Sequence, residues 1–76
     1  MSTMRVYVNG APVDVAFPST ALDCVRAWNP AEADAVASGR RLITDSRGLP
    51  APPDAPAFAG AIYRLVSNRG GSPGDG

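Results

Sequence analysis

The sequence contains no histidine and no lysine, and each absence excludes a class of chemistry. All seven basic residues among its 76 are arginines. Without histidine the chain lacks the usual general base and the commonest metal ligand. Its single cysteine, Cys24, excludes an internal disulfide and any multi-cysteine metal site. Acids and hydroxyls are present, but no motif pairs a nucleophile with a base, so we expect neither an enzyme nor a metal site.

The sequence also lacks an excess of positive or negative charge, and it lacks long apolar runs. Seven acidic residues balance the arginines, which gives no electrostatic footprint for nucleic acid. No apolar run approaches the ~20 residues of a membrane span, and the start of the chain lacks a signal-peptide pattern. The length allows one domain with a small core. We therefore expect a cytoplasmic protein that binds neither nucleic acid nor membrane.

Alternation of apolar and polar residues predicts a β-hairpin over residues 4–17, after a loose lead-in at residues 1–3. Asn9-Gly10 is the favoured pair for its tight turn. Pro12 cannot donate to a ladder, so it is expected at a strand start or an open edge. The inward side chains follow from the alternation: Met4, Val6, Val8, Val13, Val15 and Phe17.

Two start signals predict a helical region that is broken in two. Thr20 with Asp23 fits a capping box, and a spacing of three places Leu22, Val25 and Trp28 on one face, with Trp28 as a core anchor. Cys24, near that face, is interpreted as a small buried hydrophobe.

The second start signal is Asn29-Pro30, with Asn as the N-cap and Pro at the first helical position. The helix formers of residues 31–38 then end at Gly39, a C′ glycine.

A short strand is predicted at residues 40–44, followed by a turn at residues 45–48. Residues 49–57 contain four prolines and predict an extended loop that Leu49 and Phe58 pin to the core. The prolines either reduce the entropy loss of a long connection or form a ligand for aromatic grooves.

The last predicted strand, residues 61–67, runs directly into a pair of glycines. Tyr63 and Leu65 are expected to point toward the helix. Because Arg64 is charged, its face is expected to point outward and to form a partner-binding patch. The predicted partner-binding residues are Tyr7, Ile62, Arg64, Val66 and Arg69. Gly70-Gly71 follow, and a backbone without Cβ atoms can pass through a slot too narrow for side chains.

The assembled order predicts an α+β domain with a mixed sheet of four to five strands and one helix, possibly broken in two, across it. This order resembles the β-grasp fold of ubiquitin-like proteins. The stretch Arg5-Val6-Tyr7-Val8-Asn9-Gly10 resembles the start of the bacterial sulfur carriers of thiamin and molybdopterin synthesis, which end in Gly-Gly after the last strand. Ubiquitin-like modifiers end the same way, often with Arg before the glycines, as Arg69 is here.

The resemblance implies a domain over residues 1–69 and a flexible tail over residues 70–76. Because five residues follow Gly71, the chain resembles a bacterial modifier precursor that a peptidase cuts between Gly71 and Ser72. An activating enzyme would then adenylate the Gly71 carboxylate with ATP, and a conjugating enzyme would transfer it to protein targets. The chain itself would need no cofactor. Gly70 is the alternative mature end.

Two other interpretations stay open. The first is a sulfur carrier that bears a thiocarboxylate on Gly71. The second is a non-covalent β-grasp binding module, since the glycine content alone predicts about one Gly-Gly pair by chance, and ends rich in glycine, serine and proline are commonly just disordered.

Overall fold

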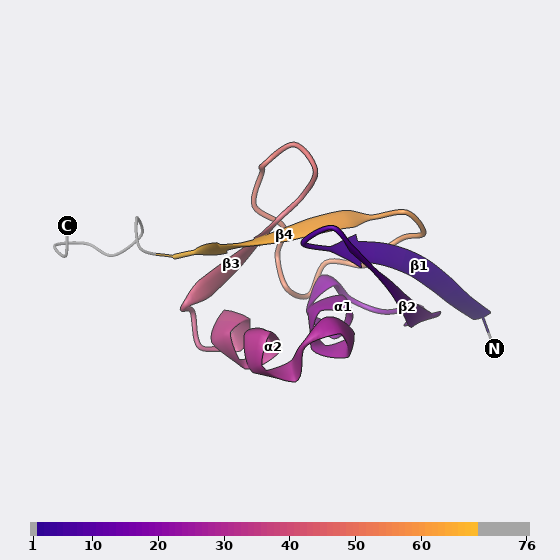
Figure 1. Ribbon diagram of the computed structural model, residues 1–76, viewed down its shortest axis with the longest axis horizontal. Coiled ribbons are helices and arrows are strands. Elements are labelled where there is room, and N and C mark those ends of the chain that lie inside the picture. Colours follow the sequence, from indigo (N-terminus) through magenta and orange to yellow (C-terminus); the bar gives the residue numbers. More distant parts are fainter. Residues whose placement is uncertain (1, 69–76) are drawn as a thin grey trace, which may run out of the picture.

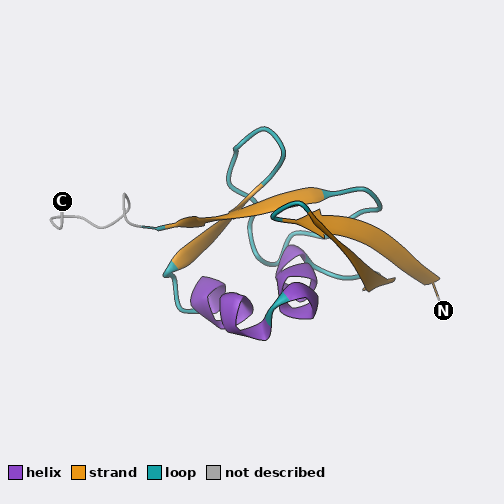
Figure 2. Cartoon of the chain, viewed as in Figure 1, coloured by secondary structure: helices purple, strands orange, loops and turns teal. Residues whose placement is uncertain are grey.

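The computed structural model describes residues 2–68 and shows a four-stranded mixed sheet with two helices on one face (Figures 1 and 2). The predicted α+β class, the mixed sheet and the break in the helical region are confirmed. Within the sheet the strand order is β2-β1-β4-β3. The elements are β1 (Ser2–Val8), β2 (Ala11–Phe17), α1 (Ala21–Trp28), α2 (Pro30–Ala37), β3 (Arg41–Thr44) and β4 (Ile62–Ser67).

The hairpin of β1 and β2 is confirmed and is longer than predicted. Asn9 and Gly10 turn the chain with positive φ angles of 53° and 84°, a conformation that these two residues tolerate best. The register pairs Ser2 with Phe17. The prediction of a loose lead-in is therefore wrong for Ser2 and Thr3, which belong to β1.

Pro12 lies where its missing N–H costs no hydrogen bond. Its partner across the hairpin is Tyr7, whose N–H donates to the Ala61 carbonyl at 2.8 Å, away from β2. Partners in such a pair share no hydrogen bond, so the nitrogen of Pro12 faces the open edge of the sheet. The predicted edge position is confirmed.

Phe17 does not join the core, although it continues the alternation of Val15. It is 56% exposed. Its partner is Ser2, the first residue of β1, so Phe17 lies at a corner of the sheet, where few neighbours pack over it.

The start of α1 is closed by its own cap and by the proline-rich loop. Thr20 Oγ1 accepts from the Asp23 N–H at 3.1 Å, and Asp23 Oδ2 accepts from the Thr20 N–H at 3.0 Å, which confirms the capping box. The N–H groups of Ala21 and Leu22 donate to loop carbonyls, those of Ala55 and Pro53, at 2.9 Å each. The loop thereby satisfies amides that a helix start leaves free.

The chain turns at Asn29 and begins α2 at Pro30, as predicted. Asn29 Oδ1 accepts from the Ala31 N–H at 3.0 Å, so Asn29 is the N-cap. At the other end Gly39 has a φ of 85°, and the Arg40 N–H donates to the Ala35 carbonyl at 2.8 Å. This is the Schellman arrangement, in which glycine is preferred at C′.

The buried face of α1 differs from the prediction. Ala21, Cys24 and Val25 are fully buried, whereas Leu22 and Trp28 are partly buried and pack at the margin of the core. Because α1 has only eight residues, one turn of it, with the small side chains, lies beneath the sheet. The larger side chains of Leu22 and Trp28 lie beside that turn. Trp28 was predicted to be a core anchor, but it is only partly buried. The prediction of Cys24 as a small buried hydrophobe is confirmed.

β4 lies inside the sheet, parallel to β1 and antiparallel to β3. The register pairs Tyr7 with Ile62 on one side and Leu42 with Val66 on the other. A parallel position of the last strand beside the first was predicted and is confirmed. β4 begins one residue later than predicted, at Ile62.

The loop between β3 and β4 is held by backbone contacts and small side chains. Leu49 and Phe58 are 50% and 64% exposed, so the prediction that they pin the loop is wrong. Ala51 and Ala57 contact the core instead. The Ala51 N–H donates to the Ile43 carbonyl at 2.8 Å. This hydrogen bond holds the loop backbone close to β3, so the methyl group of Ala51 is large enough to fill the space between the loop and the core.

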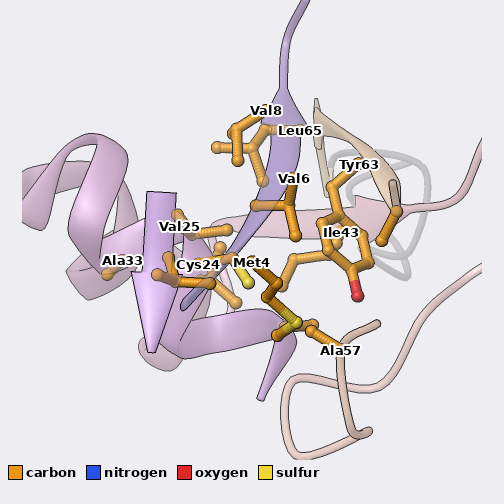
Figure 3. Close-up of a cluster of buried hydrophobic side chains, with 14 residues drawn as sticks. Met4, Val6, Val8, Cys24, Val25, Ala33, Ile43, Ala57, Tyr63 and Leu65 are labelled. Atoms are coloured by element: carbon orange, nitrogen blue, oxygen red, sulfur yellow. The ribbon is translucent and has the colours of Figure 1, made fainter. Parts of the chain in front are cut away.

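The core lies between the sheet and the helices (Figure 3). Tyr63 and Leu65 are buried in it, 5% and 9% exposed, which confirms their predicted direction. The sheet supplies Met4, Val6, Val8, Val15 and Ile43 as well, and the helices supply Ala21, Cys24, Val25, Ala33 and Val36.

Candidate functional site

The face of the sheet opposite the helices carries large apolar side chains on three neighbouring strands. Tyr7 of β1 is 36% exposed, Leu42 of β3 is 40%, and Ile62 and Val66 of β4 are 45% and 41%. The register places Tyr7 beside Ile62 and Leu42 beside Val66. We call these four residues, together with Arg64, the sheet-face patch. The predicted outward positions of Tyr7, Ile62, Arg64 and Val66 are confirmed.

Arg64 gives the patch an uncompensated positive charge. It lies between Ile62 and Val66 along β4, is exposed, and forms no ion pair within residues 2–68. Arg5, on the same face, is different because its Nε lies 2.9 Å from Asp14 Oδ1. That guanidinium hydrogen bond lowers the pKa of Asp14 below its usual range. The patch therefore suits an apolar surface that carries an acidic group.

Two shallow grooves follow one another along β4. One, of about 400 Å³, is lined by residues 9, 10 and 64–66. The other, of about 320 Å³, lies between the turn at residues 45–47 and residues 58 and 60–63. Each groove is lined in part by residues of the sheet-face patch. Side chains that protrude from a partner protein can therefore enter these grooves.

The chain is anchored one residue beyond the end of β4, at the last described residue, Asn68. The Asn68 N–H donates to the Arg40 carbonyl at 3.1 Å, and its side-chain Nδ2 donates to the Gly39 carbonyl at 2.8 Å. Both acceptors belong to the tight turn that ends α2. The chain consequently leaves the sheet from a fixed point two residues before Gly70.

The remaining predicted site residues, Arg69, Gly70, Gly71 and Ser72, lie outside the described residues. The site as described is therefore the sheet-face patch and the anchored end of β4 that precedes these four residues in the sequence.

Reactive groups are scarce near this surface. Cys24 is fully buried on the helix side, and burial raises the pKa of its thiol, so it is not a thiolate nucleophile. Burial likewise raises the pKa of Tyr63. Within residues 2–68 no three metal-ligating side chains gather.

Sequence reasoning missed Leu42 as part of the patch. Leu42 and Ile43 are adjacent and both apolar, so the alternation of this short strand does not show which one faces outward. The pairing of Leu42 with Val66 decides it, and this register was not readable from the sequence. Phe58, beside the second groove, was assigned to the core for a related reason, since its size suggested burial.

Searches of protein-family models, curated proteins and solved structures found no match to this chain. None of the helices within residues 2–68 has the length and apolar character needed to cross a membrane.

Proposed function

We propose that this chain is a ubiquitin-like modifier of the β-grasp type, made as a precursor, cut after Gly71 and joined to other proteins through the Gly71 carboxylate. The arrangement is compatible with a β-grasp domain: a hairpin, helices across one face, and a last strand parallel to the first inside the sheet. The sequence Arg69-Gly70-Gly71 follows that strand.

The anchored end of β4 carries this proposal. Asn68 donates hydrogen bonds to the carbonyls of Gly39 and Arg40. The last described residue is therefore fixed in position against the turn that ends α2. The two glycines that follow have no side chains and fit a narrow channel in a partner enzyme. A carboxylate on a bare segment beyond a rigid base suits delivery into another protein's active site.

The chemistry would lie entirely in the partners. A peptidase hydrolyses the bond between Gly71 and Ser72. In the activating enzyme, the Gly71 carboxylate attacks the α-phosphorus of ATP and releases pyrophosphate. A thiolate then displaces AMP, and a target amine displaces that thiolate to leave an amide. Adenylation is needed because a free carboxylate is a poor acyl donor.

The sheet-face patch would supply the recognition surface for these enzymes. Two of its apolar residues, Ile62 and Val66, lie on the strand that leads to Gly71, and Arg64 adds a charge that orients an acidic partner. Replacing Leu42 with Ala should weaken binding to the activating enzyme, while the fold is retained because Leu42 lies outside the core.

The test is to express the chain with an amino-terminal tag in its native cells and to analyse tagged material after trypsin digestion. Trypsin cleaves after Arg69, so every target amine joined to Gly71 keeps a Gly70-Gly71 remnant. We expect Gly-Gly remnants on other proteins with the wild-type chain, and neither Gly-Gly nor Gly-Val remnants with Gly71→Val.

The matched control is Gly74→Val, which lies beyond the cut and should leave the remnants unchanged. Remnants that persist in Gly71→Val, or their absence from the wild-type sample, would contradict the proposal. A trimmed chain without conjugates in which one oxygen of Gly71 is exchanged for sulfur would identify a sulfur carrier instead.

A further inference from the structure

The start of β4 has an open edge on the side of β3. The register pairs β3 with β4 only as far as Thr44 and Arg64. Beyond Thr44 the chain folds back in a tight turn, in which the Asp45 N–H donates to the Leu49 carbonyl at 2.9 Å, and this turn leaves the sheet (Figure 1). Ile62, the first residue of β4, therefore has no partner strand on this side within residues 2–68.

The main-chain N–H and C=O of Ile62 point into this open edge. On either side of Ile62, the carbonyls of Ala61 and Tyr63 accept from the N–H groups of Tyr7 and Asn9 at 2.8 and 2.9 Å, so both carbonyls face β1. Successive residues of a strand direct their hydrogen-bonding groups to opposite sides. The groups of Ile62 therefore face away from β1, and within the described part of the chain neither has a hydrogen-bond partner.

The open edge lies in the second of the two grooves along β4, which has a volume of about 320 Å³. Its lining includes the turn at residues 45–47 and, across from it, Phe58 and Ile62. The two side chains are 64% and 45% exposed, so the wall beside the open edge is largely apolar. An extended segment that enters the groove can pair with the Ile62 backbone and cover apolar surface at the same time.

The charges around the groove favour an acidic residue in the entering segment. On the turn, Arg47 Nη2 and Asp45 Oδ2 lie 3.3 Å apart and compensate each other. Arg64 is exposed and forms no ion pair within residues 2–68, and it lies two residues from Ile62 on the same face. A residue opposite Ile62 is diagonal to Arg64, at about 7–8 Å, which a long side chain can span. A glutamate there would cover Ile62 with its methylene groups and place its carboxylate at Arg64.

We propose that the open edge of β4 at Ile62 pairs with an extended segment of a partner protein that carries a glutamate between β-branched residues. In an antiparallel pair, Ile62 donates to the glutamate carbonyl and accepts from its N–H, so the segment continues the sheet where β3 leaves it. Strand addition of this kind takes its affinity from main-chain hydrogen bonds and its specificity from alternate side chains. The pairing uses Ile62 and Arg64 of the sheet-face patch but not Gly71, so its failure would leave the proposed conjugation untouched.

The test is an NMR titration of the full ¹⁵N-labelled chain with the synthetic peptide acetyl-Gly-Thr-Val-Glu-Val-Thr-Gly-amide. We expect a saturable shift of the Ile62 amide, because that N–H gains a hydrogen bond. N-methylation of the peptide glutamate removes the donor to the Ile62 carbonyl and should weaken binding at least about tenfold, which corresponds to about 1.4 kcal/mol. N-methylation of the valine that follows is the matched control, since its N–H points away from β4, and this peptide should bind like the parent.

A charge swap tests the contact with Arg64. Arg64→Glu should bind the parent peptide about threefold more weakly and should bind a peptide with lysine in place of glutamate more tightly than the parent. Arg26→Glu, the same change at an exposed position on α1, should bind the parent peptide like the wild type. The comparison of the two N-methylated peptides uses the wild-type chain and stands even if Arg64→Glu does not fold. No saturable shift of the Ile62 amide, equal binding of the two N-methylated peptides, or a folded Arg64→Glu that still binds the parent peptide more tightly than the lysine peptide would overturn the proposal.

Discussion

At the scale of single residues, Asn9 ties the turn between β1 and β2 to β4. It turns the hairpin with a positive φ of 53°, and its Oδ1 accepts from the Leu65 N–H on β4 at 3.1 Å. One side chain therefore fixes the turn and ties it to the strand that leads to Gly71. The sequence predicted the turn from Asn9-Gly10, but the bond to Leu65 depends on the position of β4 and was not predictable.

Asn9→Ala should lower the free energy of unfolding by about 2 kcal/mol. About 1 kcal/mol is the lost hydrogen bond, and about 1 kcal/mol is the cost of a positive φ for alanine. Asn9→Gly is the control because it loses the bond but tolerates the angle, and it should lose about 1 kcal/mol. Urea denaturation measures both, and equal stability of the two variants would contradict this division.

Asp45 should make the fold sensitive to acid. Its Oδ1 accepts from the N–H groups of Leu49 and Arg47 at 3.0 and 2.8 Å, and these bonds, together with Arg47, lower the pKa of its carboxyl. The stability from ionised Asp45 is complete above about pH 4, the ordinary carboxyl pKa, and is lost as the pH falls through the lowered pKa.

Asp45→Asn keeps an acceptor for both amides but removes the charge. We expect the difference in urea midpoint between about pH 7 and about pH 2 to be smaller in this variant than in the wild type. Asp34→Asn, an exposed position on α2, should leave that difference unchanged. An unchanged pH dependence in Asp45→Asn would contradict the role assigned to this carboxylate.

At the scale of elements, the parts with local signals were predicted well. The capping box at Thr20, the second start at Asn29-Pro30 and the glycine at residue 39 act within a few residues of chain, and all three are present. The parallel position of β4 was also predicted, but the burial of several large side chains, which depends on neighbours from elsewhere in the chain, was predicted wrongly. Phe17 and Phe58 are exposed because burial depends on what lies over a side chain as well as on its size.

In β3, too, residue type did not show which side chain is buried, and this strand offers a direct test. Ile43 is 2% exposed and its neighbour Leu42 is 40% exposed. Ile43→Ala should cost about 2–5 kcal/mol through lost burial and a cavity, a large part of the roughly 4–11 kcal/mol expected for a chain of this length. Leu42→Ala should cost less than about 1 kcal/mol. If urea denaturation gave the two variants similar losses, the assignment of the two faces would be wrong.

At the scale of the whole molecule, the parallel pairing of β1 and β4 separates the two ends of the described chain. β1 begins at one end of the sheet and β4 ends at the other (Figure 1). An amino-terminal fusion should therefore leave the surface around β4 free. We expect a tagged chain to give the same amide spectrum for residues 62–68 as the untagged chain, and changed shifts there would contradict this arrangement.

The central claim is that Gly71 becomes the working carboxylate, and the intact mass of the chain recovered from its native cells tests it most directly. We predict a free form that ends at Gly71, together with heavier species in which that form is joined to other proteins. Recovery of the chain with Ser72 and the residues beyond it still attached, and without adducts, would contradict the claim and leave the domain as a non-covalent binding module.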